Sequence, residues 1–229
     1  MYVIFVKGGE RVTFSQNARR AKQQIDAVVG CSFVIEEGSG KVMFSAPHCV
    51  EQVRGGKAKC AEPQTGLLAQ MLHNEFDCPI IRKVENRGDD ANFDPVSDYK
   101  EALTAYVREN KVAFLIDLHQ LSPKREVMIN FGTGDFANID DISLLNVFVS
   151  AFSRHKLGTI QLDEPFGATY VHTVSATVHR ECQIPCLQIE LNSRLLGEGY
   201  GEYALETVYA ALAECYKELT EMYDRRGTL

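Results

Sequence analysis

The sequence lacks any apolar run that approaches the roughly 20 residues needed to cross a bilayer. It also lacks a block of basic residues, and its formal net charge of −7 argues against a nucleic-acid partner or an anionic membrane surface. Its seven cysteines include no CxxC pair, so a reduced, cytoplasmic protein with mostly buried free thiols is the simplest interpretation. These absences predict a protein with neither a membrane nor a nucleic-acid partner.

Features that would divide the chain are missing as well. The first residues, Met1 to Lys7, have no charged leader, and their short apolar run predicts a first strand instead of a signal peptide. No repeat, linker or low-complexity segment interrupts the 229 residues, so we expect a single domain over residues 1–229. A hydrophobic content of 45% is ordinary for a globular protein and is sufficient for a sizeable core.

Short apolar runs alternate with segments of helical spacing along the chain. The runs predict strands at Val3–Val6, Val12–Phe14, Phe33–Glu36, Val42–Phe44, Pro79–Val84, Val112–Ile116, Glu126–Phe131, Thr159–Leu162 and Cys186–Leu191. The periodic segments predict helices at Asn17–Val29, Thr65–Phe76, Ser97–Glu109, Ile142–His155 and Tyr203–Tyr223. The polar segment Gln52–Cys60 predicts a loop that could act as an active-site flap. This alternation is typical of a three-layer α/β sandwich with a mixed, mostly parallel sheet.

The segment from Ser45 to Glu51 places an imidazole and a carboxylate three residues apart, directly after an apolar run. If the chain turns there, His48 and Glu51 point the same way, because residues i and i+3 share a face. A catalytic zinc site of the His/His/Glu type needs one further imidazole. Alone, this HxxE spacing is more typical of an ordinary surface turn.

Polar residues follow four of the predicted strands. Sites in open α/β sheets form where the carboxyl ends of strands meet the next loops. The residues at these ends are His48 and Glu51, then Asn86 and Arg87, then Asp117 and His119, and finally Gln188, Glu190 and Asn192. The last three share one face of their strand, because side chains alternate with period two.

The residue types at these ends suit metal-assisted hydrolysis. Two imidazoles and one carboxylate, from His48, His119 and Glu51, form the ligand set of a catalytic zinc ion. Zinc lowers the pKa of a bound water toward ~7 and polarises a scissile carbonyl. Glu190 could take the proton of that water and pass it to the leaving amine. Asp117 could orient a ligand imidazole through its other ring nitrogen.

The candidate substrate contacts are mainly arginines. Arg87, beside Asn86, could hold a substrate carboxylate through two parallel hydrogen bonds. No motif marks the arginine that polarises the scissile carbonyl, and the candidates are Arg54, Arg82 and Arg194. We therefore expect a small-molecule carboxylate as the substrate. The sequence leaves open whether the chain forms a homo-oligomer.

Each of these residues also has a purely structural interpretation. His119 could be a core histidine that is hydrogen-bonded to backbone. Gln188 lies on the same strand face as Glu190 and is expected, like Asp117, to support the site from behind the residues that contact metal or substrate. Arg87 could be the ion-pair partner of Glu190, because a carboxylate inside an apolar strand is costly unless it is paired or neutralised.

The order of these segments resembles the zinc carboxypeptidases and their relatives, the aspartoacylases and N-formylglutamate amidohydrolases. The resemblance is strongest to the N-formylglutamate amidohydrolase group. Its motifs appear here as Ser45-Ala46-Pro47-His48, Asn86-Arg87, Asp117-Leu118-His119 and Gln188-Ile189-Glu190-Leu191-Asn192. The resemblance covers about Ser45 to Leu196, although the loop after Arg87 continues differently, as Gly-Asp-Asp-Ala-Asn.

This resemblance implies a phosphorylase/hydrolase-like α/β fold with one zinc ion. It assigns the zinc ligands to His48, Glu51 and His119, the carboxylate clamp to Arg87 and the acid/base role to Glu190. The expected activity is cleavage of the amide bond of an N-acyl acidic amino acid such as N-formylglutamate. A carboxypeptidase or peptidoglycan amidase of the same architecture would instead act on peptides, and a non-catalytic domain would bind ligands without turnover.

Overall fold

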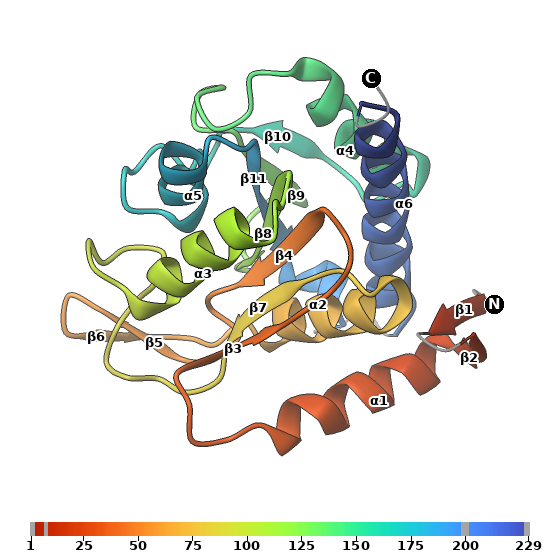
Figure 1. Cartoon of the computed structure of the whole chain (residues 1–229), viewed down its shortest axis with the longest axis horizontal. Coiled ribbons are helices and arrows are strands. Elements are labelled where there is room, and N and C mark those ends of the chain that lie inside the picture. Colours follow the sequence, from red (N-terminus) through yellow and green to blue (C-terminus); the bar gives the residue numbers. More distant parts are fainter. Residues whose placement is uncertain (1–2, 7–8, 198–201, 227–229) are drawn as a thin grey trace.

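A seven-stranded sheet forms the centre of the computed structural model, which describes residues 3–6, 9–197 and 202–226 (Figure 1). In spatial order the strands are β10 (Ile160–Leu162), β9 (Ile129–Gly132), β11 (Cys186–Asn192), β8 (Phe114–Leu121), β4 (Val42–Ala46), β7 (Ile80–Lys83) and β3 (Phe33–Glu36). Strands β11, β8, β4 and β7 run parallel to one another, whereas β9 and β3 are antiparallel to their neighbours β11 and β7. This mixed, mostly parallel sheet confirms the predicted fold class.

Helices cover both faces of the sheet and so complete three layers (Figure 1). One face carries α2 (Pro63–Phe76), α4 (Ile142–Arg154) and α6 (Glu202–Arg226), with α1 (Phe14–Ala27) lying against α2. The other face carries α3 (Asp98–Glu109) and α5 (Val174–Cys182). Over the described ranges, none of these helices combines the length and the hydropathy that a membrane span requires.

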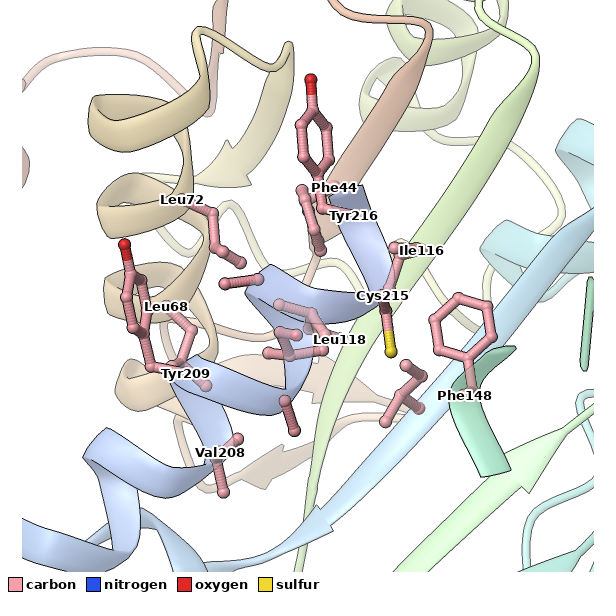
Figure 2. Close-up of a cluster of buried hydrophobic side chains, with 14 of the residues drawn as sticks. Phe44, Leu68, Leu72, Ile116, Leu118, Phe148, Val208, Tyr209, Cys215 and Tyr216 are labelled. Atoms are coloured by element: carbon pink, nitrogen blue, oxygen red, sulfur yellow. The ribbon is translucent and has the colours of Figure 1, made fainter. Parts of the chain in front are cut away.

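Each face of the sheet has its own hydrophobic core. Side chains alternate along a strand, so Ile116 and Leu118 of β8 point to one face and Leu115 points to the other. Figure 2 shows the core that contains Ile116 and Leu118, where Leu72 of α2 and Phe148 of α4 lie near these two side chains, and α6 runs close by. These four side chains, and Leu115 on the other face, are fully buried.

The same alternation decides where the polar residues of the central strands point. Asp117 and His119 continue the series that begins with Leu115, and Gln188 and Glu190 lie on the neighbouring strand in matching register. These four polar residues therefore share the face that carries α3 and α5, close to the carboxyl ends of the strands. The fold thus brings together two of the segments that the sequence analysis selected.

Two further pairs of strands lie outside the main sheet: β1 (Val3–Val6) with β2 (Glu10–Thr13), and β5 (Gln52–Arg54) with β6 (Lys57–Lys59). The second pair corrects the prediction of a loop over Gln52–Cys60. Gly55 and Gly56 both have positive φ, 57° and 75°, which is the conformation of a two-residue hairpin turn. The many lysine, arginine and glycine residues of this segment concealed its strand character.

The first core provides a test of this architecture. Leu118→Ala should destabilise the protein by about 2–5 kcal/mol, because it removes fully buried methyl groups and leaves a cavity between the sheet and the helices. Urea unfolding would measure the change. Leu162→Ala is a matched control, because Leu162 is 40% exposed on β10. A cost for Leu118→Ala no larger than that of the control would contradict the assigned core.

Candidate metal centre and active-site cavity

Two imidazole rings meet at the carboxyl edge of the sheet. His48 follows β4, and His119 lies near the end of the adjacent strand β8. Their Nδ1 atoms are 3.2 Å apart and their ring centroids are 4.8 Å apart. Both residues are buried, with relative exposures of 4% and 1%.

Glu62, at the N-terminus of α2, completes this group. One of its carboxylate oxygens lies 3.3 Å from Nδ1 of His48 and the other lies 3.7 Å from Nδ1 of His119. Its backbone N–H donates to the carbonyl of His48 at 2.8 Å, and Gln120 N–H donates to Oε2 at 3.0 Å. One ligand atom from each of the three residues can be chosen so that all lie within 4.8 Å of one another, so the group could hold a metal ion.

Glu51, the predicted carboxylate ligand, lies outside this group. Its side chain is exposed and accepts a long hydrogen bond of 3.4 Å from Asn86. The chain enters β5 directly after Glu51, and i and i+3 side chains share a face in a helical turn but not in extended backbone. The hairpin of β5 and β6 then returns the chain to His48, so the nearby carboxylate comes from Glu62 instead.

A second carboxylate holds the outer nitrogen of each ring. Nε2 of His48 lies 2.8 Å from Asp90, and Nε2 of His119 lies 3.1 Å from Asp117. Both aspartates are completely buried. Such partners orient an imidazole and direct the lone pair of its other nitrogen toward a metal. Asp117 lies where the sequence analysis expected it, whereas Asp90 belongs to a polar loop that offered no motif.

The electrostatic environment favours positive charge at the two rings. Burial alone would lower the pKa of His48, but the negative charge of Glu62 and the hydrogen bonds to Asp90 and Glu62 raise that pKa to about 10. Burial opposes protonation of His119 too, yet Asp117 raises the pKa of His119 above its usual value. Burial would raise the pKa of Asp90, but its hydrogen bond with His48 brings that pKa below the usual range. A proton or a metal cation can supply the favoured charge.

Glu190 approaches the same space from β11. It is only 7% exposed, and burial raises the pKa of Glu190 to about 7, against the opposing charge of His119. Near neutral pH, a carboxyl group with this pKa is present in both protonation states. It can therefore accept a proton in one step and return it in the next.

A chain of side-chain amides fixes the orientation of Glu190. Val174 N–H donates to Oδ1 of Asn92 at 2.7 Å, so the amide nitrogen of Asn92 points the other way and donates to Oε1 of Gln188 at 3.4 Å. Gln188 Nε2 then donates to Oε1 of Glu190 at 3.2 Å. Because a backbone N–H can only donate, the direction of the whole chain is set at Val174. The sequence analysis selected Gln188 but missed Asn92.

A cavity of about 610 Å³ opens over these groups, a volume suited to a small-molecule ligand. Its wall contains the two imidazoles, Glu62 and Glu190. The hairpin of β5 and β6 contributes Arg54 and Lys59, and the loop between β8 and β9 contributes Arg125. Loops at residues 92–93 and 165–173 and the strand residue Gln188 contribute further parts of the wall.

Arg82, a predicted substrate ligand, is absent from the described wall of this cavity. It lies on β7 two residues after Ile80, so its side chain points to the face covered by α2. There its Nε donates to Gln70 at 3.3 Å, and its guanidinium lies 3.6 Å from Glu36. The alternation of side chains along β7 therefore places Arg82 on the wrong side of the sheet for a ligand in this cavity.

The other two predicted arginines also point elsewhere. Arg87 is exposed and pairs with Glu85 at 2.8 Å, while its neighbour Asn86 contacts Glu51. Arg194 donates to the backbone carbonyl of Arg125 at 2.6 Å and so supports the loop between β8 and β9. Neither Asn86, Arg87 nor Arg194 is among the described residues that line the cavity.

The arginines that do line the cavity are Arg54 and Arg125. Arg54 Nε donates to Asp90 at 2.7 Å, and its guanidinium carbon lies 4.8 Å from the ring centre of Phe93. The guanidinium carbon of Arg125 lies 4.9 Å from the ring centre of Phe166. The sequence analysis named Arg54 only as a candidate for carbonyl polarisation, and the segment around Arg125 carries no motif.

Comparison with solved structures identifies the class of fold. An N-formylglutamate amidohydrolase from Ralstonia eutropha JMP134 matches with a TM-score of 0.53 and 14% identity over 86% of this chain and 99% of that one. A metallo-carboxypeptidase from Burkholderia cenocepacia matches with a TM-score of 0.54 and 10% identity, over 93% of this chain and 70% of that one. The Atu2144 gene product from Agrobacterium tumefaciens matches with a TM-score of 0.60 and 14% identity, over 85% of this chain and 97% of that one.

The chain therefore has the α/β fold of the carboxypeptidase-like hydrolases, the fold that the sequence resemblance implied. No protein-family model and no curated protein sequence matches it. At 10–14% identity these structures establish the fold alone.

The two glutamates near His48 provide a test of the metal centre. If the group binds a metal, Glu62→Gln should abolish stoichiometric metal binding, because it removes the charge of the carboxylate that faces both Nδ1 atoms. Glu51→Gln should leave the metal content unchanged, because Glu51 is exposed and outside the group. Plasma mass spectrometry after incubation with divalent metals would measure both variants. Loss of metal in Glu51→Gln with retention in Glu62→Gln would reverse the assignment.

Proposed function

We propose that this protein is a zinc-dependent hydrolase that cleaves an amide bond in a small substrate bearing a carboxylate. The observation that carries this proposal is the convergence of His48, Glu62, His119 and Glu190 on one cavity. Two imidazoles and one carboxylate are the ligands of many catalytic zinc sites, which keep a further position for water or substrate. When bound, zinc would supply an activated water at neutral pH and polarise the scissile carbonyl.

The residues present fit such an ion. The Nδ1 atoms of His48 and His119 and the carboxylate of Glu62 face one another, and the outer ring nitrogens are already engaged by Asp90 and Asp117. Nitrogen and carboxylate donors of this kind suit zinc. The raised pKa values of both imidazoles support the same conclusion, because they reflect a site where positive charge is favoured.

Glu190 is the proton-transfer group in this proposal. Its carboxylate accepts a proton from the attacking water and later donates it to the nitrogen of the departing amine. A pKa of about 7 suits both steps. Gln188 already donates to Oε1 of Glu190, so Oε2 is the oxygen that carries the proton.

Arg54 takes the role of substrate ligand that the sequence analysis gave to Arg87. The buried carboxylate of Asp90 binds both Nε of Arg54 and Nε2 of His48, so one group orients the arginine and the metal-site ring together. The bond to Asp90 uses Nε, and the two Nη groups of Arg54 make no hydrogen bond to the described residues. Both Nη groups are therefore left for a ligand. A planar guanidinium binds a carboxylate through two parallel hydrogen bonds.

Replacement of the proton-transfer group tests the mechanism. Glu190→Gln in the zinc-loaded protein should lower kcat for N-acyl amino acids at least about 100-fold, because an amide cannot shuttle the proton. The metal content should stay unchanged. Glu126→Gln is a control, since Glu126 is exposed and outside the cavity wall. Near-normal kcat in Glu190→Gln would exclude Glu190 from proton transfer, and no turnover in the wild type would favour a ligand-binding domain.

Asn92→Asp tests the amide chain. The new carboxylate still accepts from Val174 N–H but cannot donate to Gln188, so Gln188 turns its oxygen toward Glu190. We expect kcat to fall about tenfold, equivalent to about 1.4 kcal/mol of activation free energy, with little change in KM or metal content.

A double-mutant cycle separates this role from a general structural one. In a Gln188→Ala background, Asn92→Asp should have little further effect on kcat, because Asn92 acts through Gln188. Independent, additive losses in the double variant would contradict the proposed chain.

A further inference from the structure

The charges in the cavity wall differ from those of the whole chain. The chain carries a formal net charge of −7. Among the described wall residues, however, the carboxylates are Glu62, a candidate metal ligand, and Glu190, the proposed proton-transfer group, while Arg54, Lys59 and Arg125 are cations. Away from the metal centre, the cavity is therefore a local basic region that favours anionic groups on a ligand.

The two arginines lie on opposite sides of the metal centre. Asp90, the partner of Arg54, follows β7, whereas Phe166, the partner of Arg125, donates its N–H to Asn130 of β9 at 2.9 Å. In the sheet, β11, β8 and β4 lie between β9 and β7 and carry the proton-transfer and metal-site residues. Neighbouring strands are about 4.8 Å apart, so β7 and β9 are separated by roughly 19 Å.

The backbone that carries Arg125 is held firmly by Asn192 at the end of β11. The completely buried side-chain amide nitrogen of Asn192 lies 3.4, 3.1 and 2.9 Å from the carbonyls of Ser122, Arg125 and Val127, and its two hydrogens are shared among these three acceptors. Arg194 adds a further hydrogen bond to the carbonyl of Arg125. These bonds position the loop without using the guanidinium of Arg125.

That guanidinium is available to a ligand. It stacks on Phe166 and has no carboxylate partner among the described residues. Stacking restrains the plane of a guanidinium while leaving its N–H groups at the edge for an anion. A pre-positioned, uncompensated arginine in a cavity wall is the arrangement expected of an anion subsite.

We propose that Arg125, supported by Phe166, forms a second anion subsite opposite Arg54. The substrate is then an amide with an acidic group on each side of the scissile bond: one carboxylate on the amine part and one on the acyl part. This inference rests on the proposed function and departs from N-formylglutamate, whose acidic groups both lie on the amine side of the amide. Arg54 binds one of the two acidic groups and Arg125 binds the other.

Three matched ligands separate the two subsites: N-succinyl-L-alanine has a carboxylate on both sides, N-butyryl-L-alanine only on the amine side, and N-succinyl-L-alaninamide only on the acyl side. Calorimetric titration into zinc-loaded Glu190→Gln protein measures binding without turnover. We expect the diacid to bind at least about tenfold more tightly than either monoacid, because each carboxylate gains charge-assisted hydrogen bonds.

The arginine variants should then show complementary losses. Arg125→Gln should remove the affinity gain from one carboxylate, and Arg54→Gln should remove the gain from the other. Lys124→Gln, an exposed neighbour outside the described cavity wall, should retain both gains. The inference is overturned if Arg125→Gln leaves both gains intact, or if both arginine variants remove the same one.

Turnover by the wild type keeps the two proposals distinguishable. If the zinc-loaded wild type cleaves N-butyryl-L-alanine as fast as the diacid, the hydrolase stands and the second subsite fails. If it cleaves none of the three compounds but binds the diacid with the complementary losses, the subsite stands and the proposed function fails.

Discussion

The burial of two imidazoles among carboxylates is the constraint on which the rest of this structure depends. Glu62 faces both Nδ1 atoms, Asp90 and Asp117 hold the outer nitrogens, and Glu190 lies nearby. Burying this many ionisable side chains carries a large desolvation cost unless each one is paired. The fold meets this requirement at the carboxyl edge of a parallel sheet, where several strands can deliver side chains to one point.

Most of the fold was accessible from local sequence patterns. Continuous apolar runs predict buried parallel strands, and the run around Ile116 became β8 at the centre of the sheet. Alternation within strands also placed Asp117 with His119, and Gln188 with Glu190. These relations extend over two residues, so no knowledge of the tertiary structure was needed to see them.

The rest of the site depends on contacts that no local pattern encodes. Glu62 reaches His48 only because Gly55 and Gly56 turn the chain back through a hairpin. Arg82 and Arg87 had suitable chemistry, but strand alternation turns one to the far face and an exposed loop carries the other. Spacing along the chain suggested two imidazoles and one carboxylate, whereas the hairpin decided which carboxylate lies beside the two imidazoles.

The loop after β7 shows how one polar segment can connect all parts of the site. From the sequence it had little to bury, yet Asp90 binds His48 and Arg54, and Asn92 leads through Gln188 to Glu190. Two buried lysines hold this loop in place. Lys83 pairs with Asp89, and Lys100 donates to the carbonyls of Asp94 and His172. The loop has few apolar side chains that could anchor it in a core. The two lysines anchor it instead, because their ammonium groups satisfy carboxylate and carbonyl groups that would otherwise be buried without a partner. His48, Arg54 and Glu190, to which the proposed function assigns metal binding, substrate binding and proton transfer, thus share one support, and a change in any of these loop contacts would reach all three.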